Sequence, residues 1–297
     1  MRLGAFELKE PIPELKDPVA FAILRPWIDV NNVGSLVMKE LEVQCGAIEF
    51  ARLRNPGRFF DFSRYRPVLY FDEQGIRRLK IPNTIISYSK NVLQNDFLFL
   101  RLLEPHSNSE IYVESILKIL KRFNTKRYCL LGSMLDAVPH TKPLIVNGGA
   151  FGKEAQADLK RSGALQSKYQ GPTTITYLIS QKAPEFGIET MVFVVSLPQY
   201  IEVEEDYLGK LRLMEILNLL FQIPINKMDY EKAAEQRNLI DQKVERSQEL
   251  KNIIPQLEAL YELRIKRDED ESKVPSLSPE IEEFLWKMMG KDFGGKA

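Results

Sequence analysis

Apolar runs alternate with stretches of helical spacing from residue 19 to residue 221 of the chain. Runs that are apolar or alternate in polarity, each bounded by turn-forming residues, predict strands at 19–25, 47–53, 67–71, 84–89, 96–102, 127–132, 143–148 and 190–198. Several of these runs are apolar at every position, which is typical of strands covered on both faces. Helical spacing predicts helices at 33–41, 110–123, 153–161, 173–183 and 207–221.

This alternation of strands and helices predicts an α/β protein, a three-layer α/β/α sandwich with the sheet between two layers of helices. The stretch YFDEQGIRRLKIP, residues 70–82, has the pattern of a β-hairpin with its turn at residues 72–75. We expect this hairpin to add antiparallel pairing to the sheet. The predicted sheet is therefore mixed.

Strand patterns end after residue 228, and helical spacing continues to residue 266. Proline is disfavoured inside a helix but accepted in its first turn, so Pro255 places a break near residues 250–252 and predicts a helical hairpin. The run KRDEDESK indicates a solvated linker, and SPEIEEFLWKMMG a short terminal helix capped by Ser278. These patterns predict three parts: an α/β core domain at 1–228, a hairpin arm at 229–266, and a charged linker with the terminal helix at 267–297.

Composition narrows the class of protein. The chain is 44% hydrophobic and 28% charged, which is ordinary for a folded soluble protein. Its 41 basic and 41 acidic residues balance, so no net charge attracts nucleic acid or an anionic membrane. Acids and prolines near the N-terminus do not fit a signal peptide, and no apolar run reaches the roughly 20 residues that span a bilayer. We therefore expect a cytoplasmic protein with neither nucleic acid nor membrane as partner.

The sequence contains no complete motif for catalysis or metal binding. Its two cysteines, Cys45 and Cys129, form neither a CxxC pair nor a Cys/His cluster. The stretch NGGAFGKEA departs from a phosphate-binding P-loop, because Asn147 replaces the first glycine and Glu154 the magnesium-binding hydroxyl. There is no GxSxG motif, and two histidines leave few bases for serine-type catalysis. We therefore assign no catalytic residue, no metal and no cofactor, and expect no ATP-dependent ligase activity.

Polar residues follow several of the predicted strands, at the edge where open α/β sheets bind small molecules. His140 lies in a loop between two prolines, where it either contacts a ligand or holds the loop in place. Asp29 either caps the helix that follows or faces the same site, and Thr174 presents the same alternatives at the next helix N-terminus. If these residues bind a ligand, the sequence predicts one pocket lined by Asp29, Asn31, Glu104, His140, Thr141, Thr174 and Tyr200.

Several stretches of the chain resemble the proteasome assembly chaperone 2 family. They are RPWIDVNNVGSLVMKEL (25–41), LLEPHSNSEIY (102–112), LGSMLDAVPHTKPLIVNG (131–148) and GPTTITYLISQKAPEFGIETMVFVVSLPQYIE (171–202). The resemblance spans residues 19–263. The chain departs from the family pattern at Lys142, where arginine is usual, and at Gln199, where histidine is usual.

The resemblance implies a nucleoside-phosphorylase-like fold and frequent homo-oligomers, in a family whose bacterial members have also been labelled ATP-grasp-like carboxylate-amine ligases. We therefore expect a non-enzymatic, homo-oligomeric binding or assembly-chaperone-like protein that engages another protein. A trimer is favoured, held together in part by the arm, unless the arm folds back on its own core. The alternative is an enzyme or a small-molecule sensor that uses the polar pocket. Proteasome-binding proteins often end in a hydrophobic residue, tyrosine and one more residue, whereas this chain ends FGGKA, so we expect no proteasome activation by that route.

Overall fold

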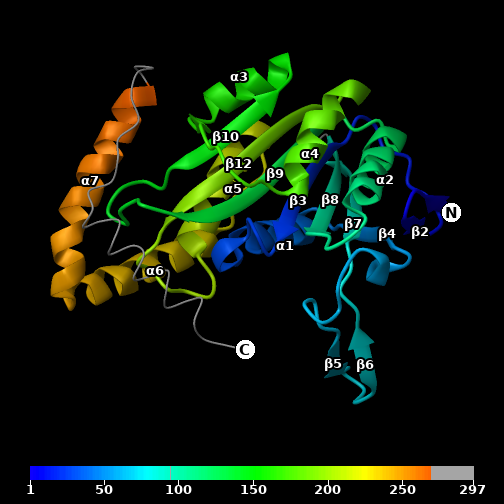
Figure 1. Cartoon of the computed structure of the whole chain (residues 1–297), viewed down its shortest axis with the longest axis horizontal. Helices are drawn as coiled ribbons and strands as arrows, with labels where there is room; N and C mark the ends of the chain where they lie inside the picture. Colours follow the sequence, from blue (N-terminus) through cyan, green and yellow to red (C-terminus); the bar gives the residue numbers. More distant parts are fainter. Residues whose placement is uncertain (94, 269–297) are drawn as a thin grey trace.

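A computed structural model describes residues 1–93 and 95–268 of the chain (Figure 1). The strands of its main sheet are β1 (Arg2–Leu3), β2 (Phe6–Leu8), β3 (Val19–Arg25), β4 (Ile48–Leu53), β7 (Ile85–Val92), β8 (Asn95–Leu103), β9 (Arg127–Asp136), β10 (Val146–Phe151), β11 (Leu165–Gln166) and β12 (Glu189–Pro198). Their order across the sheet is β1-β2-β4-β7-β8-β3-β9-β12-β10-β11. The helices are α1 (Val33–Gln44), α2 (Ser109–Arg122), α3 (Lys153–Arg161), α4 (Ile175–Lys182), α5 (Tyr207–Phe221), α6 (Lys227–Glu245) and α7 (Gln248–Asp268).

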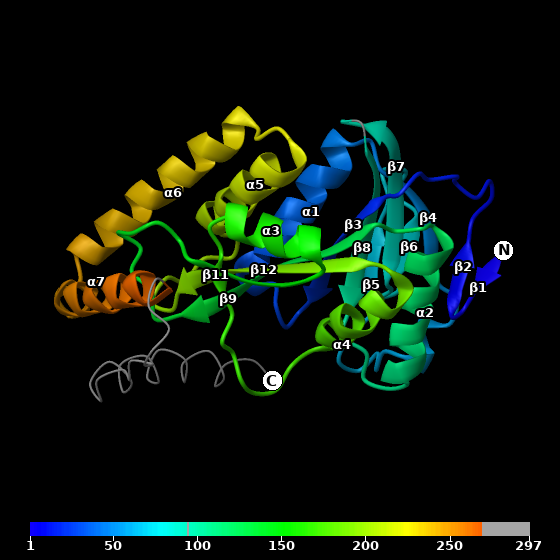
Figure 2. The same ribbon diagram turned by 90° about the horizontal axis from the view of Figure 1, so that it is seen from above.

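The centre of the sheet is parallel and buried. Strand β3 pairs in parallel with β8 on one side and β9 on the other, and β9 pairs in parallel with β12. The first six residues of β3 are buried, as the lack of alternation in its sequence predicts. Helices α1, α3 and α5 cover one face of the sheet, and α2 and α4 cover the other (Figure 2). The predicted three-layer α/β/α sandwich with a mixed sheet is confirmed.

The predicted strand at 143–148 is wrong by three residues, because β10 runs from Val146 to Phe151. Leu144 and Ile145 are buried and extend the apolar pattern toward the N-terminus, although they precede the ladder. Pairing with β12 begins at Val146 and continues through Gly148 and the next glycine, two residues that sequence patterns treat as the end of a strand.

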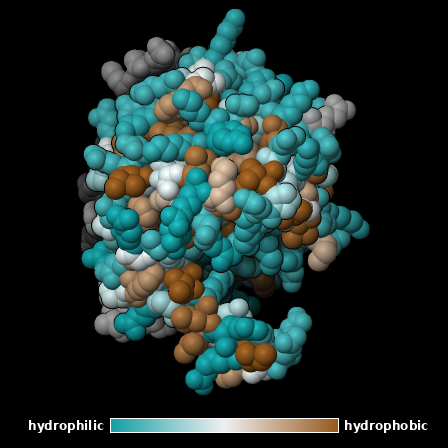
Figure 3. All heavy atoms as spheres, turned by 90° about the vertical axis from the view of Figure 1, so that its right-hand side faces the viewer, coloured by the Kyte–Doolittle hydropathy of each residue, from teal (hydrophilic) through white to brown (hydrophobic). Residues whose placement is uncertain are grey.

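The hairpin at residues 70–82 forms as predicted, but its place in the fold differs from our expectation. Strands β5 (Val68–Phe71) and β6 (Arg77–Lys80) pair with each other and form a separate two-stranded sheet. The turn places Gly75 at φ 72°, a conformation that glycine adopts at little cost. This ribbon projects from the body of the molecule (Figures 1 and 3). Antiparallel pairing in the main sheet comes instead from β1, β2, β4, β7 and β10.

The C-terminal helical hairpin, which we call the arm, consists of α6 and α7. The break between these helices lies at residues 246–247, not at 250–252, and Pro255 lies inside α7. The side chain of Ser247 explains the difference, because its hydroxyl accepts the N–H of Leu250 at 3.3 Å and so caps α7 three residues earlier than the proline suggests. The predicted terminal helix and nearly all of the charged linker lie outside the described residues. No helix in the described part of the chain has the length and apolar character to span a membrane.

A buried ion network joins the arm to the core. The Nζ of Lys210 on α5 lies 2.6 Å from a carboxylate oxygen of Asp229 on α6 and 3.2 Å from one of Glu40 on α1. Lys210 and Asp229 are only 5% and 4% exposed, so neither charge has water to stabilise it. A buried charge requires an opposite charge close by, and this network therefore fixes where the arm begins.

We predict that Lys210→Met lowers the free energy of unfolding by about 3 kcal/mol, because the apolar replacement fills the same space but leaves Asp229 and Glu40 without their cation. Urea denaturation of the full chain measures the change. Lys227→Met is the matched control, since the exposed Lys227–Glu231 pair at 3.4 Å should contribute less than about 1 kcal/mol. Equal losses in the two variants would contradict the role of the buried network.

Candidate functional site

Loops that follow the central parallel strands meet at one edge of the sheet. Asp29 follows β3, Glu104 follows β8, His140 follows β9 and Tyr200 follows β12. Because these strands are neighbours and parallel, their carboxyl ends lie at the same edge, as the sequence predicts for its pocket residues. The seven predicted residues fall into three groups along this edge, and each group makes its own contacts.

The first group, Asp29 and Asn31, lies between β3 and α1. The carboxylate of Asp29 is buried and accepts the N–H of Ser35, in the first turn of α1, at 2.9 Å. It also accepts the Ser35 hydroxyl, so it satisfies two donors at the start of this helix. Burial raises the pKa of Asp29 above its ordinary value. Asn31 adopts a left-handed backbone conformation, and its carbonyl accepts the N–H of Asp206 before α5 at 3.0 Å.

The second group, Glu104 and Thr174, lies at the start of α4. One oxygen of Glu104 accepts the N–H of Ile175, the first residue of α4, at 3.2 Å. Glu104 therefore caps this helix from another strand, while the hydroxyl of Thr174 contacts that of Thr176 at 2.6 Å. The second carboxylate oxygen of Glu104 is buried without a hydrogen-bond partner among the described residues. Burial raises the pKa of Glu104, so this carboxyl group is more easily protonated than an exposed one.

The third group, His140, Thr141 and Tyr200, faces the arm. The phenol oxygen of Tyr200 lies 2.7 Å from the backbone nitrogen of His140 and 2.7 Å from its Nδ1. The Nε2 of His140 lies 3.3 Å from a carboxylate oxygen of Asp241 on α6. All three contacts are satisfied when the phenol accepts the backbone N–H and donates to Nδ1 while Nε2–H donates to Asp241. His140 is therefore held at both ring nitrogens, by the core on one side and by the arm on the other.

The loop at residues 136–142 continues this contact along α7. Together with Tyr200, we call this loop the arm socket. Three more contacts tie it to the second helix of the arm: Thr141 to Glu258, Lys142 to Glu262 at 2.7 Å, and Asp136 to Arg264 at 2.8 Å. An apolar cluster lies beneath these contacts, made of Tyr200, Ile240, Val244, Ile253 and Leu257. The histidine loop that the sequence singles out thus binds the arm of its own chain.

Sequence reasoning did not identify the partners of this loop. Glu258 and Glu262 lie four residues apart and so share one face of α7, which is a signal of a contact made by that face. The departures from the family pattern lie at the same place. Lys142 pairs with Glu262, and the backbone N–H of Gln199 donates to the carbonyl of Asp136 at 3.3 Å. The ligand-binding role of the seven residues stays a prediction.

The pH dependence of the arm contact follows from the pKa of His140. Burial lowers this pKa, and Asp241 only partly opposes the shift; Arg237 and Glu258 are the other charged groups that face the ring. In the unfolded chain the ring has its ordinary pKa of about 6.5. As the pH falls below that value, the unfolded chain binds more protons than the folded protein. The stability associated with neutral His140 is therefore complete above about pH 6.5 and is lost as the pH falls through the lower pKa of the folded protein.

We predict that His140→Gln weakens the dependence of stability on pH between about pH 7.5 and 5, because the replacement cannot titrate. The free energy of unfolding, measured with urea at a series of pH values, gives the slope. His106 is the other histidine of the chain and accepts the backbone N–H of Asp61, so His106→Gln is the matched control. This variant should keep the part of the pH dependence of stability that comes from His140. The assignment is wrong if His106→Gln removes the slope and His140→Gln retains it.

Comparison with known proteins identifies the family. The model of the PAC2 family matches residues 23–246, and a search of curated proteins found no match. A protein of unknown function from Corynebacterium glutamicum has a similar structure, with a TM-score of 0.78 and 17% identity, covering 90% of this chain and 100% of the other. A PAC2 family protein from Streptomyces avermitilis gives a TM-score of 0.71 and 23% identity over 81% of this chain and 99% of the other.

A proteasome-assembly chaperone homologue from Mycobacterium tuberculosis gives a TM-score of 0.69 and 20% identity, over 80% of this chain and 99% of the other. At these identities the structural likeness establishes the fold. The family model extends from within β3 to the end of α6, and it includes the arm socket. This match confirms the resemblance found in the sequence, and the chain belongs to the PAC2 family.

Proposed function

We propose that this chain is a non-enzymatic, homo-oligomeric protein of the assembly-chaperone type that binds another protein. The similarity to a proteasome-assembly chaperone homologue supports a role of this kind. The observation that carries the proposal is the projecting ribbon of β5 and β6, because its apolar side chains have no cover within the described chain. All eight residues of the two strands are exposed.

One face of the ribbon carries three exposed apolar side chains and one arginine. Cross-strand pairing puts Leu69 opposite Leu79 and Phe71 opposite Arg77, so these four side chains share one face. Leu69, Phe71 and Leu79 are 64%, 67% and 55% exposed, which is a large apolar surface for an element surrounded by water. Isolated two-stranded ribbons are marginally stable in water, and contiguous exposed apolar surface is typical of protein interaction sites. A partner protein would therefore stabilise the ribbon as it binds.

The charges of the ribbon define the partner. Arg77, Arg78 and Lys80 on β6 outnumber Asp72 and Glu73 in the turn, so the ribbon is basic as well as apolar. Among the described residues, each strand of the ribbon pairs on one edge only, and its other edge can pair with a third strand. These features favour a partner protein with an apolar surface bordered by carboxylates.

Self-association is the second part of the proposal, with a trimer as its form. The inner apolar stripe of the arm packs on the arm socket of its own chain. Other apolar side chains of the arm still face solvent, among them Leu239 on α6 and Leu263 on α7. We assign these outward residues to the contact between subunits, since helices with apolar residues on two faces usually have partners on both.

An enzyme or small-molecule sensor is the second candidate function. The unpaired buried oxygen of Glu104 and the raised pKa of its carboxyl favour it, because perturbed carboxyl groups at the carboxyl ends of strands are common in active sites. Asp29 and His140, however, already contact α1 and the arm. These two polar groups of the predicted pocket are thus engaged in holding the fold, and we rank the binding role first.

We predict that replacing Leu69 and Phe71 together by aspartate abolishes partner binding, because charged side chains cannot enter an apolar interface. Affinity purification of the full-length protein from cells of its source, followed by quantitative mass spectrometry, compares the variant with the wild type. Val43→Asp is the matched control, since Val43 is an apolar residue of α1 that is 72% exposed. The same proteins recovered in the same amounts with wild type and ribbon variant would contradict the proposal.

We predict that the protein has about three times the mass of its 34.3 kDa chain in solution, by light scattering coupled to gel filtration at micromolar concentration. Aspartate at both Leu239 and Leu263 should convert it to a monomer, because it places charge in an apolar contact. The ribbon variant should keep the trimer mass. A monomeric wild-type protein overturns the trimer, and dissociation caused by the ribbon variant alone would move the subunit interface from the arm to the ribbon.

A further inference from the structure

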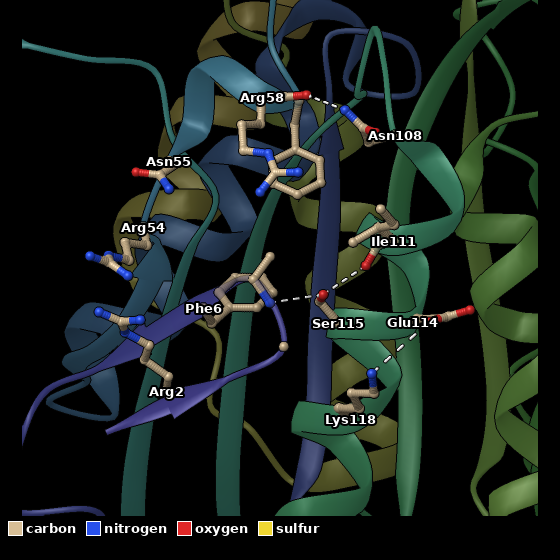
Figure 4. A pocket seen from close by; sticks show the side chains of 13 residues that line it. Arg2, Phe6, Arg54, Asn55, Arg58, Asn108, Ile111, Glu114, Ser115 and Lys118 are labelled. Atoms are coloured by element: carbon tan, nitrogen blue, oxygen red, sulfur yellow. Dashed lines mark hydrogen bonds and ion pairs between the residues drawn. The ribbon is translucent and has the colours of Figure 1, made fainter.

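A cavity of about 260 Å³ lies at the edge of the fold opposite the arm, between the N-terminal strands, the segment after β4 and helix α2 (Figure 4). We call it the arginine cavity. Its basic groups are three arginines, Arg2 from β1, Arg54 just after β4 and Arg58 from the 3₁₀ helix at Pro56–Arg58, and Lys118 from α2. Ile111, which is exposed, provides apolar surface beside them, and the buried rings of Phe6 and Phe59 form part of the cavity floor. The cavity belongs to neither the arm socket nor the ribbon.

Tight contacts on both sides fix the shape of this cavity. The turn between β1 and β2 rests on α2, where the N–H of Ala5 donates to the hydroxyl of Ser115 at 3.0 Å. A Cβ at Gly4 would lie 2.7 Å from that hydroxyl, so only glycine permits this approach. On the other side, the amide of Asn108 at the start of α2 donates to the carbonyl of Arg58 at 2.7 Å. The backbone that carries the arginines is therefore held in place before any ligand arrives.

The charges around the cavity are not balanced by the protein. Arg2, Arg54 and Arg58 form no ion pair with a carboxylate in the part of the chain that the structure describes. Glu114 is the acidic residue of the lining, and it lies 4.0 Å from Lys118 and points away from the arginines (Figure 4). Guanidinium groups stay charged at all ordinary pH values, so their mutual repulsion cannot be relieved by loss of a proton. A bound anion would relieve it.

We propose that the arginine cavity binds the phosphate group of a small phosphomonoester with an apolar remainder. A phosphomonoester carries about 1.5 to 2 negative charges near pH 7 and three terminal oxygens, whereas a carboxylate carries one charge and two oxygens. Three guanidinium groups, one from β1 and two from the segment after β4, match the phosphate better, because each can donate two parallel hydrogen bonds to it. The volume is near the lower end for small-molecule sites, so the apolar remainder is about the size of one ring.

The site goes beyond the proposed function, because it gives the protein a ligand that no partner protein supplies. Its lining connects β1, the segment directly after β4, and α2, and β4 pairs with β7 in the main sheet. The chain leaves β4 at residue 53 and enters β7 at residue 85, and the ribbon is inserted between these two points. Arg54 and Arg58 therefore lie at the start of the segment that carries the ribbon, so an anion bound there would order the base of the element that we assign to partner binding.

Calorimetric titration of the full-length protein with phenyl phosphate, in a phosphate-free buffer of constant ionic strength, tests the site. We expect saturable binding that Arg54→Gln and Arg58→Gln each weaken by about tenfold or more, since each loses a bidentate contact to a dianion. Arg64→Gln is the matched control: Arg64 is an exposed residue of the following loop beside Asp61, and its replacement should leave the affinity unchanged. Benzoate has the same ring and only one charge, so its affinity should be lower than that of phenyl phosphate by about tenfold or more.

Three results would overturn the proposal. The first is that phenyl phosphate shows no saturable binding at millimolar concentration. The second is that the control Arg64→Gln weakens binding as much as Arg54→Gln and Arg58→Gln do, and the third is that benzoate binds as tightly as phenyl phosphate. Arg54, Arg58 and Arg64 are exposed, so their replacement by glutamine should not unfold the chain. Unchanged thermal melting of each variant verifies this point. Failure of this test leaves the ribbon experiment unaffected, because that experiment measures protein partners without added phosphate.

Discussion

The burial of β3 on both faces is the constraint from which the rest of the architecture follows. Its apolar residues are paired through their backbones with β8 and β9 and need side-chain cover above and below the sheet. Helices must therefore lie on both faces, and chain crossovers must return each new parallel strand to the same direction. The loops after these strands consequently gather at one edge, although they come from distant parts of the sequence.

That edge is used mainly to join parts of the protein to each other. Asp29 satisfies donors of α1, Glu104 satisfies a donor of α4, and His140 contacts both the core and α6. Residues of the types that catalyse reactions elsewhere thus serve here as helix caps and as the contact surface for the arm. Their burial shifts pKa values in the same way as in an active site, so perturbed pKa values alone do not separate structural from chemical roles.

The sequence predicted the elements that large-scale burial determines. Central strands lack alternation and surface helices have an apolar stripe, so both were recognised, as was the helical hairpin that follows them. Strands β1, β2 and β11 contain two or three residues each, too few to show a period. The break before α7 depends on one hydroxyl, that of Ser247, whose capping role competes in the sequence with the nearby proline.

The site was predicted less completely, for a physical reason. The residues that follow parallel strands can be placed at one edge from the strand pattern, and this part of the prediction matches the topology. The side chains that cover the histidine loop at that edge come from α6 and α7, about 100 residues further along the chain, and local patterns carry no record of such distant pairing. Likewise, Arg2 and Arg54 are ordinary surface arginines in the sequence, and only the pairing of β2 with β4 brings them together.

The separation of the arm from its socket also sets the order of folding. The socket is complete once Tyr200 has been made, 58 residues before Glu258 (258 − 200), so on a ribosome that adds about 5–20 residues per second it precedes its partner helix by several seconds. During that interval Tyr200 and its loop have no arm to cover them. Closing so long a loop is also among the slower steps of folding, because contacts between distant residues form late. The newly made protein therefore passes through a stage in which Tyr200 and the polar groups of its histidine loop, which later bind the arm, are open to water.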